Sequence, residues 1–202
     1  EHETTLHFMY LFAWAHEWQG HYDLAKEPVT KALEISQRIV GEEHLTTIQA
    51  MSLLGWLHTV AGRHEEAMQV QSRAVELSHR VLGKDHLCTI YFTTRLADLY
   101  GAIGQDDRQG ALLTEQLRIS QRVLGREHAV TRFIRWRLDP LPEALSRTAR
   151  EEYEAGAHAD AIKTLSRKNE LCRLLKPERV ELTLSDLAVL AVSLHRLGRD
   201  EE

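Results

Sequence analysis

The sequence predicts an all-α fold, a right-handed α-solenoid of antiparallel helix pairs with about four and a half repeats. The first observation behind this prediction is that Gly41, Gly83 and Gly125 are spaced 42 residues apart. The second is that Gly20, Gly62 and Gly104 each lie 21 residues before one of them. The third is that apolar residues recur at helical spacing between the glycines. A fixed period of this length indicates stacked units of one helix pair each.

Each half of the period predicts one helix. Residues 45–62 carry apolar side chains at helical spacing and stop at a glycine, and residues 64–83 open with acids, are amphipathic and stop at the next glycine. Glycine suits both stops because it enters the left-handed conformation without a Cβ clash. Small residues recur where paired helices must approach closely, at Ala13, Gly55 and Ala97 on first helices and at Ala25, Ala32, Ala67 and Ala74 on second helices.

The regularity fails in the second half of the chain. Gly156 comes ten residues later than the period requires, and Asp139-Pro140-Leu141-Pro142 cannot continue a helix. We therefore expect an irregular break near 131–142, with a short helix near 129–138, a resumed helix from about 141 to 155, and a kink in the stack near Pro140. The predicted repeats are 1–42, 43–84, 85–126, 127–178 with the insertion, and a partial fifth at 179–202. Three of the alanine positions on second helices are filled by Gln109, Gln116 and Lys168.

The composition argues against binding to nucleic acid or to a membrane. The net charge of −5 gives no basic field that would attract nucleic acid or an anionic membrane, and no apolar run is long enough to span a bilayer. The two cysteines, Cys88 and Cys172, occupy apolar helical positions, which favours small core residues in a reducing compartment over a disulfide. We expect a cytoplasmic protein that binds neither nucleic acid nor membrane.

The histidines and the known catalytic motifs give no indication of a metal site or an active site in this sequence. His16-Glu17 with His21, and His2-Glu3 with His7, resemble a zinc-binding helix motif, but histidines five residues apart point to different sides of a helix. Phosphate-binding loops, nucleophile elbows and CxxC pairs are missing from the sequence. The sequence therefore predicts no catalytic residues, no metal, no cofactor and no enzyme.

The pattern Leu54-Gly55, Gly62, Ala67, Ala74 resembles the tetratricopeptide repeat, and the added tail RVLGKDH resembles its 42-residue, kinesin-light-chain-like form. The resemblance implies a protein that binds a peptide or protein segment in a concave groove, as a regulatory or interaction region of a larger protein. It also implies that first helices line that groove. Transferred position by position, the groove residues are Tyr10, Trp14, Glu17, Trp18, Gln49, Ser52, Trp56, Tyr91, Arg95, Asp98, Arg147, Arg150 and Tyr153. Trp14 and Trp56 lie one period apart and should project from one wall.

The resemblance to kinesin light chains does not extend to the residues with which those proteins bind cargo. The asparagines with which such repeats hold a peptide backbone are replaced here by Leu11, Leu53 and Arg95, so an asparagine clamp is excluded. The alternative function is a structural spacer or a self-association module without a ligand groove. It is suggested by the apolar end helices near 6–18 and 182–198, which predict either a longer natural chain or a homo-oligomer through these ends.

Overall fold

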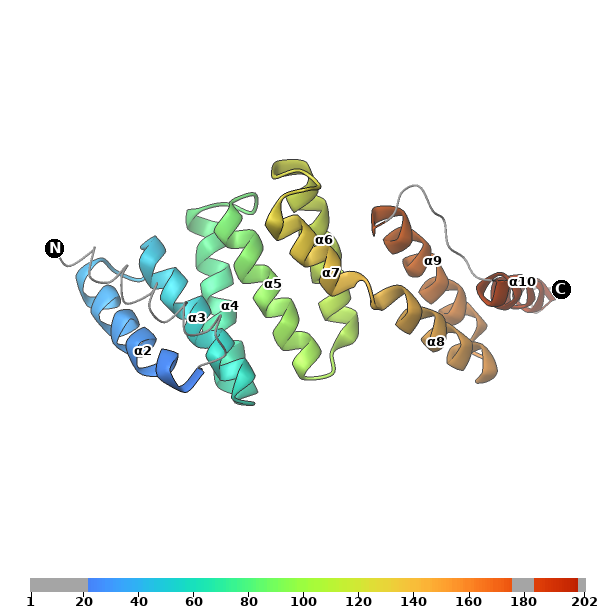
Figure 1. Cartoon of the computed structure of the whole chain (residues 1–202). Coiled ribbons are helices and arrows are strands. Elements are labelled where there is room, and N and C mark those ends of the chain that lie inside the picture. Colours follow the sequence, from blue (N-terminus) through green and yellow to red (C-terminus); the bar gives the residue numbers. More distant parts are fainter. Residues whose placement is uncertain (1–21, 176–183, 200–202) are drawn as a thin grey trace. The chain divides into compact units, whose positions relative to one another are not determined.

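The computed structural model describes residues 22–175 and 184–199, and throughout these ranges the regular structure is α-helical (Figure 1). The helices are α2 (Tyr22–Ile39), α3 (Leu45–Val60), α4 (His64–Val81), α5 (Leu87–Ala102), α6 (Asp106–Val123), α7 (Ala129–Leu138), α8 (Leu141–Glu154), α9 (His158–Leu175) and α10 (Leu184–Arg199). They pack as sequential antiparallel pairs, which confirms the predicted fold class. Among these described helices, none combines the length and the apolarity needed to cross a membrane.

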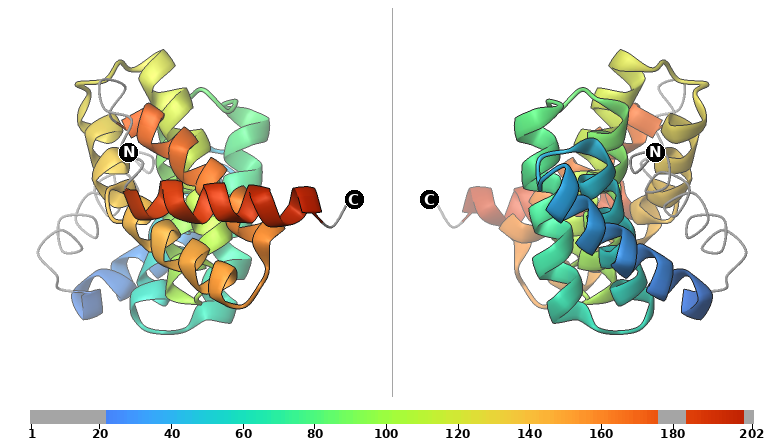
Figure 2. Two further views of the ribbon diagram at one scale, coloured as in Figure 1. Left: turned by 90° about the vertical axis from the view of Figure 1, so that its right-hand side faces the viewer. Right: turned by 90° about the vertical axis from the view of Figure 1, so that its left-hand side faces the viewer.

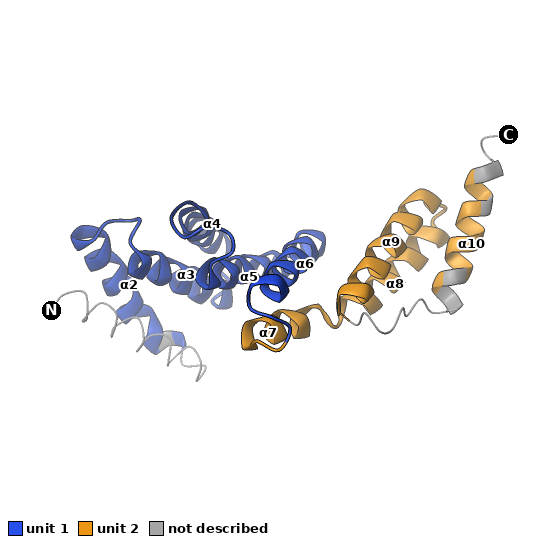
Figure 3. Cartoon of the chain, turned by 90° about the horizontal axis from the view of Figure 1, so that it is seen from above, with its two compact units in different colours: residues 1–126 blue, residues 127–202 orange. Residues whose placement is uncertain are grey.

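The chain divides into two compact units, residues 1–126 and 127–202 (Figure 3). In the first unit α3 pairs with α4 and α5 pairs with α6, while α2 packs on α3 and α4 packs on α5 (Figures 1 and 2). In the second unit α8 pairs with α9, and α10 packs against both. The predicted repeat boundaries and the predicted kink near Pro140 stay predictions.

Glycines in the left-handed conformation end the helices, as the sequence predicts. Their φ values are positive at Gly41, Gly62, Gly83, Gly104, Gly125 and Gly156. At Gly83, where φ is 81°, the backbone N–H donates to the carbonyl of His79 at 3.2 Å and so closes α4. Any other residue would be strained at this φ, so the glycine series sets where each helix ends.

Histidines begin α3, α5 and α7, which are first helices of the predicted repeats. We call the first helices of the repeats inner helices and the second helices outer helices. The side-chain Nδ1 of His44, His86 and His128 accepts a hydrogen bond from the backbone N–H two residues later, at 3.3, 3.2 and 3.2 Å. No acid lies in the first turn of these three helices. The outer helices α4 and α6 start instead without a side-chain cap and carry two acids each in the first turn. The two kinds of helix therefore satisfy their N-terminal N–H groups in different ways, by a cap and by charge.

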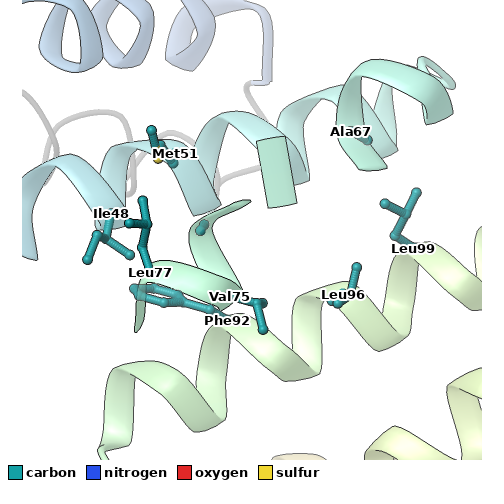
Figure 4. Close-up of a cluster of buried hydrophobic side chains, with 9 residues drawn as sticks. Ile48, Met51, Ala67, Val75, Leu77, Phe92, Leu96 and Leu99 are labelled. Atoms are coloured by element: carbon teal, nitrogen blue, oxygen red, sulfur yellow. The ribbon is translucent and has the colours of Figure 1, made fainter. Parts of the chain in front are cut away.

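The core of the first unit joins α3, α4 and α5 (Figure 4). It is formed by Ile48, Met51, Ala67, Ala74, Val75, Leu77, Phe92, Leu96 and Leu99. Ala67 and Ala74 are fully buried, and a Cβ on Gly55 would lie 2.6 Å from Oε1 of Gln71 on α4. The predicted small residues thus mark the places where α3 and α4 come closest.

The predicted break is present between α7 and α8. α7 ends at Leu138 and α8 begins at Leu141, one residue after Pro140. Pro140 and Pro142 offer no backbone N–H, so two donors of a continuous helix are missing within three residues. The short helix and the resumed helix match the expected ranges of 129–138 and 141–155 to within one residue.

Candidate functional site

Four of the predicted groove residues, Tyr10, Trp14, Glu17 and Trp18, lie outside the described residues. The expected alignment of Trp14 with Trp56 therefore stays a prediction. The predicted residues on α3 and α5 are described, and these two inner helices are neighbours in the first unit.

Trp56, Tyr91 and Arg95 come together where α3 faces α5, and we call this group the Arg95 stack. Cζ of Arg95 lies 5.4 Å from the ring centroid of Trp56 and 4.7 Å from that of Tyr91. Nη2 of Arg95 also donates a 2.6 Å hydrogen bond to the hydroxyl of Tyr91, one turn earlier on α5. A guanidinium between two aromatic rings gains cation–π attraction on its faces, which holds all three side chains in one arrangement.

Burial differs within the Arg95 stack. Arg95 is only 5% exposed, whereas Trp56 and Tyr91 are half-buried. A buried guanidinium is tolerated where aromatic faces and hydrogen bonds replace its water. Asp98, three residues further along α5, is 8% exposed and adds a carboxylate to the same side of the helix. The stack therefore offers two rigid aromatic edges around a fixed cation.

The other predicted residues of α3 serve contacts inside the first unit. Ser52 is 1% exposed, and its hydroxyl accepts a 3.1 Å hydrogen bond from Nε2 of Gln71 on α4. Gln49 is half-buried and hydrogen-bonds the thiol of Cys88. Burial raises the pKa of that thiol, and the bond to Gln49 offsets part of the rise. Both side chains support the position of α3 against its neighbours.

The predicted residues of the fourth repeat lie on α8, in the second unit. Arg147 and Arg150 are exposed. Tyr153 is half-buried and packs against the ring of His158, with 5.4 Å between the ring centroids.

Sequence reasoning missed an exposed aromatic group on α7, formed by Phe133, Trp136 and Arg137, which we call the α7 patch. Cζ of Arg137 lies 5.7 Å from the Phe133 centroid and 5.9 Å from the Trp136 centroid, and the two rings are 6.3 Å apart. Trp136 is 63% exposed. The signal was available, because Phe133 and Arg137 follow Tyr91 and Arg95 by 42 residues. It was missed because the fourth set of groove positions was counted from the far side of the insertion.

Metal binding finds no support in residues 22–175 and 184–199, where no three His, Cys, Asp or Glu side chains gather in a way that could hold an ion. Cys88 and Cys172 form no disulfide, and their side chains are half-buried and buried respectively. The chemistry that the inner helices offer is therefore aromatic contact, hydrogen bonding and charge.

Comparison with known proteins gives a family match over part of the chain and a similarity in fold over nearly all of it. A family model described as tetratricopeptide repeat matches residues 4–78. No curated protein matches the chain. Among solved structures, a candidate kinesin light chain of Podosopora anserina with nearly identical TPR-like repeats is 20% identical, with a TM-score of 0.58 over 100% of this chain and 90% of that chain. BtubC (BKLC) from P. vanneervenii is 17% identical, with a TM-score of 0.58 over 95% of this chain and 77% of that one. At these identities the likeness to the solved structures concerns the fold alone.

Proposed function

We propose that the inner helices bind a peptide or protein segment along a concave groove, because residues 4–78 match the tetratricopeptide repeat and repeats of this type generally mediate protein–protein interaction. The region would act as a non-catalytic scaffold within a larger protein. The observation that carries this proposal is the Arg95 stack.

The composition of the Arg95 stack supports binding. Tryptophan, tyrosine and arginine are the residues most enriched among those that dominate binding energy at protein interfaces. Trp56 and Tyr91 are partly accessible, and the guanidinium already fixes their rings. A partner that meets side chains held in advance loses less conformational entropy on binding.

The α7 patch supports the same function from the second unit. Phe133 and Arg137 occupy the register positions of Tyr91 and Arg95 and again place an arginine over an aromatic ring. A tryptophan that is 63% exposed, beside a second exposed ring, is typical of an interaction surface. The α7 patch is therefore a separate candidate contact surface, on the second unit.

A second candidate function is structural, and two observations favour it. Arg95 is 95% buried, which also suits a side chain that only fills space between helix pairs. Val192 and Leu194 on α10 are 37% and 53% exposed, and such a face could carry self-association. In this alternative the chain is a spacer or an assembly module without a ligand groove.

The two functions are separated by peptide selection on the full chain with a phage-displayed random library, followed by affinity measurement for the selected peptides. We expect Trp56→Ala and Arg95→Met to weaken binding by about tenfold or more while the Tm stays within a few degrees. Arg80→Ala, which removes a half-exposed arginine of the outer helix α4, is the matched control and should leave affinity unchanged. Where Trp56→Ala lowers the Tm strongly, Trp56→Phe provides the milder test.

Failure to select any peptide, or equal binding by wild type and both variants, would contradict the groove. Loss of folding in all of the Trp56 and Arg95 variants would instead assign these side chains to packing and favour the structural alternative.

A further inference from the structure

The junction between α9 and α10 carries a charged pair at two positions that are apolar at the α4–α5 junction. Counting the period and the ten-residue insertion, Lys168 on α9 occupies the position of Ala74 on α4, and Asp186 on α10 occupies that of Phe92 on α5. Ala74 and Phe92 belong to the apolar core of the first unit. At the α9–α10 junction the same two positions are joined by a hydrogen-bonded ion pair between Nζ of Lys168 and Oδ2 of Asp186.

The ion pair of Lys168 and Asp186 is buried. Their side chains are 4% and 3% exposed. About one turn away on α9 and α10, Leu165 and Val189 belong to the apolar core of the second unit, which is formed with Ala149 and Ala161. The pair is therefore shielded from water on the face where α10 packs on α9.

Net stability does not account for a buried pair at this place. Removing two charges from water costs about as much as their attraction returns, and well-packed apolar residues of similar volume are often as stabilising or more so. The cost is large only when one charge is buried without the other. Compared with an apolar contact such as that of Ala74 and Phe92, a buried ion pair adds a free-energy cost whenever either helix packs against a helix that lacks the opposite charge.

A second junction has its own buried polar contact. Gln71 on α4 is 1% exposed, and its Nε2 donates to Oγ of Ser52 on α3 at 3.1 Å and to the carbonyl of Phe92 on α5 at 2.8 Å. The corresponding positions on the other outer helices are filled by the buried apolar residues Val29, Leu113 and Leu165. The α4–α5 junction thus has a buried polar contact at a position that is apolar on the other outer helices, and the α9–α10 junction has a buried ion pair at positions that are apolar at the α4–α5 junction.

We propose that the Lys168–Asp186 pair is a pairing code, which makes the face of α9 that α10 covers accept α10 and reject the inner helices of other repeats. Helix pairs built on one plan present similar faces, so an inner helix could dock on the wrong outer helix within one chain or between copies. Asp186 placed against Ala74 would bury a carboxylate without the Lys168 ammonium, and Phe92 placed against Lys168 would bury that ammonium without the Asp186 carboxylate. The partner that this surface fits is a helix with a carboxylate at the position of Asp186.

The first experiment measures amide hydrogen exchange of α10 in the full chain. Lys168→Ala and Asp186→Phe should each speed exchange in α10 by about 100-fold or more, because each leaves one buried charge without its partner. Lys168→Ala/Asp186→Phe, which restores the residues of the α4–α5 junction, should return exchange to within about tenfold of wild type. The matched control is Lys31→Ala, which breaks an exposed Lys31–Glu27 pair on α2 and should leave α10 unchanged. Single variants that leave exchange in α10 unchanged would overturn the proposal.

The second experiment tests selection itself. Three proteins are refolded from urea at the same concentration, and their molar masses are measured by light scattering. They are wild type, Lys168→Ala/Asp186→Phe and the charge swap Lys168→Asp/Asp186→Lys. The apolar double variant should form several-fold more high-mass species than wild type, because its α10 now suits other outer helices. The charge swap keeps a matched pair and should refold as wild type does. Equal refolding of the apolar variant and wild type would show that the pair selects nothing and would overturn the code, whether or not the groove of the inner helices binds peptide.

Discussion

The second and third helix pairs, α3 with α4 and α5 with α6, have the same lengths and the same register but different residues at their closest approach. In the second pair Gly55 faces Gln71, while in the third pair the same positions are filled by Ala97 and Leu113. In the third pair Gly101 faces Gln109, and the same positions are filled by Thr59 and Ala67 in the second. A glutamine on the outer helix is thus matched by a glycine on the inner helix in both pairs, at different turns.

This exchange shows what the repeat preserves. Helices pack at a separation set by the side chains between them, and an interior filled to crystal density tolerates extra volume poorly. A larger residue on one helix is accommodated where the facing residue of the other helix is a glycine, which has no Cβ. The separation of the paired helices is therefore retained while the residues that set it change.

The largest effect is expected from Gly55→Ala. The new Cβ would lie 2.6 Å from Oε1, 3.1 Å from Cβ and 3.2 Å from the backbone N of Gln71, and Gln71 is buried and bonded to two helices. Overpacking of this kind costs about 1–3 kcal/mol, and the helix propensity of alanine returns up to about 1 kcal/mol. We expect a loss of about 2 kcal/mol in the free energy of unfolding, measured by urea denaturation.

The third pair supplies the rescue and the control for this variant. Gly55→Ala/Gln71→Leu copies Ala97 and Leu113 and should recover at least half of the loss. Gly101→Ala also brings a Cβ within 2.6 Å of a glutamine, but there it meets only the far end of the half-buried Gln109 side chain, which can turn away. This variant should change stability by less than about 0.5 kcal/mol. Equal losses for Gly55→Ala and Gly101→Ala would refute the distinction between the two glutamines.

Much of the fold followed from the sequence because the period repeats backbone requirements. Gly83 and its counterparts must adopt positive φ, and Pro140 cannot continue a helix, so both features could be placed before any coordinates. Gln71 and Lys168 could not be placed in the same way. Whether a glutamine or a lysine at a position that is apolar in most other repeats is buried and paired depends on the residue opposite, and that residue lies 21 or 18 positions away in the chain.

The candidate site was predictable to a smaller extent. The period places Trp56 on one first helix and Tyr91 and Arg95 on the next, but helical spacing alone does not say that Arg95 turns between the two rings. Ser52 satisfies the same spacing and yet hydrogen-bonds inward to Gln71, because adjacent positions on one helix face divide between groove and core. The α7 patch escaped prediction because an insertion leaves two ways to continue the count.

The second effect in size concerns a feature that the two pairs share. His44 and His86 cap α3 and α5 with the same Nδ1 contact, so His44→Ala and His86→Ala should each cost about 1 kcal/mol in urea denaturation. His86→Asn keeps a side-chain acceptor at the cap and should stay within a few tenths of a kcal/mol of wild type. If the alanine and asparagine variants were equally stable, the contact of Nδ1 would not act as a cap.

The smallest effect concerns two charged positions whose signs are reversed between the second and third helix pairs. Arg73 on α4 binds Glu42 through Nη2 at 2.6 Å and Nε at 2.9 Å, while the same positions of the third pair are filled by Glu115 and Lys84. The hydrogen bonds from Arg73 hold the pKa of Glu42 below its usual value. A carboxyl group whose folded pKa is lowered stabilises the fold above its unfolded pKa and loses that contribution as pH falls through the folded pKa.

Arg73→Ala should therefore lower the urea midpoint slightly at pH 7, where the exposed pair is weak, and the difference from wild type should shrink below about pH 4.5, as Glu42 becomes protonated in the unfolded chain and then in the folded one. High salt at pH 7 should reduce the difference as well, because it screens the pair. Glu42→Gln is the matched variant, and its difference from wild type should follow the same course with pH. If the difference between Arg73→Ala and wild type were the same at pH 7 and pH 3, the contact of Arg73 with Glu42 would stabilise through packing and not through charge. The reversed signs at the same positions of the third pair, Glu115 and Lys84, would then make no difference to stability.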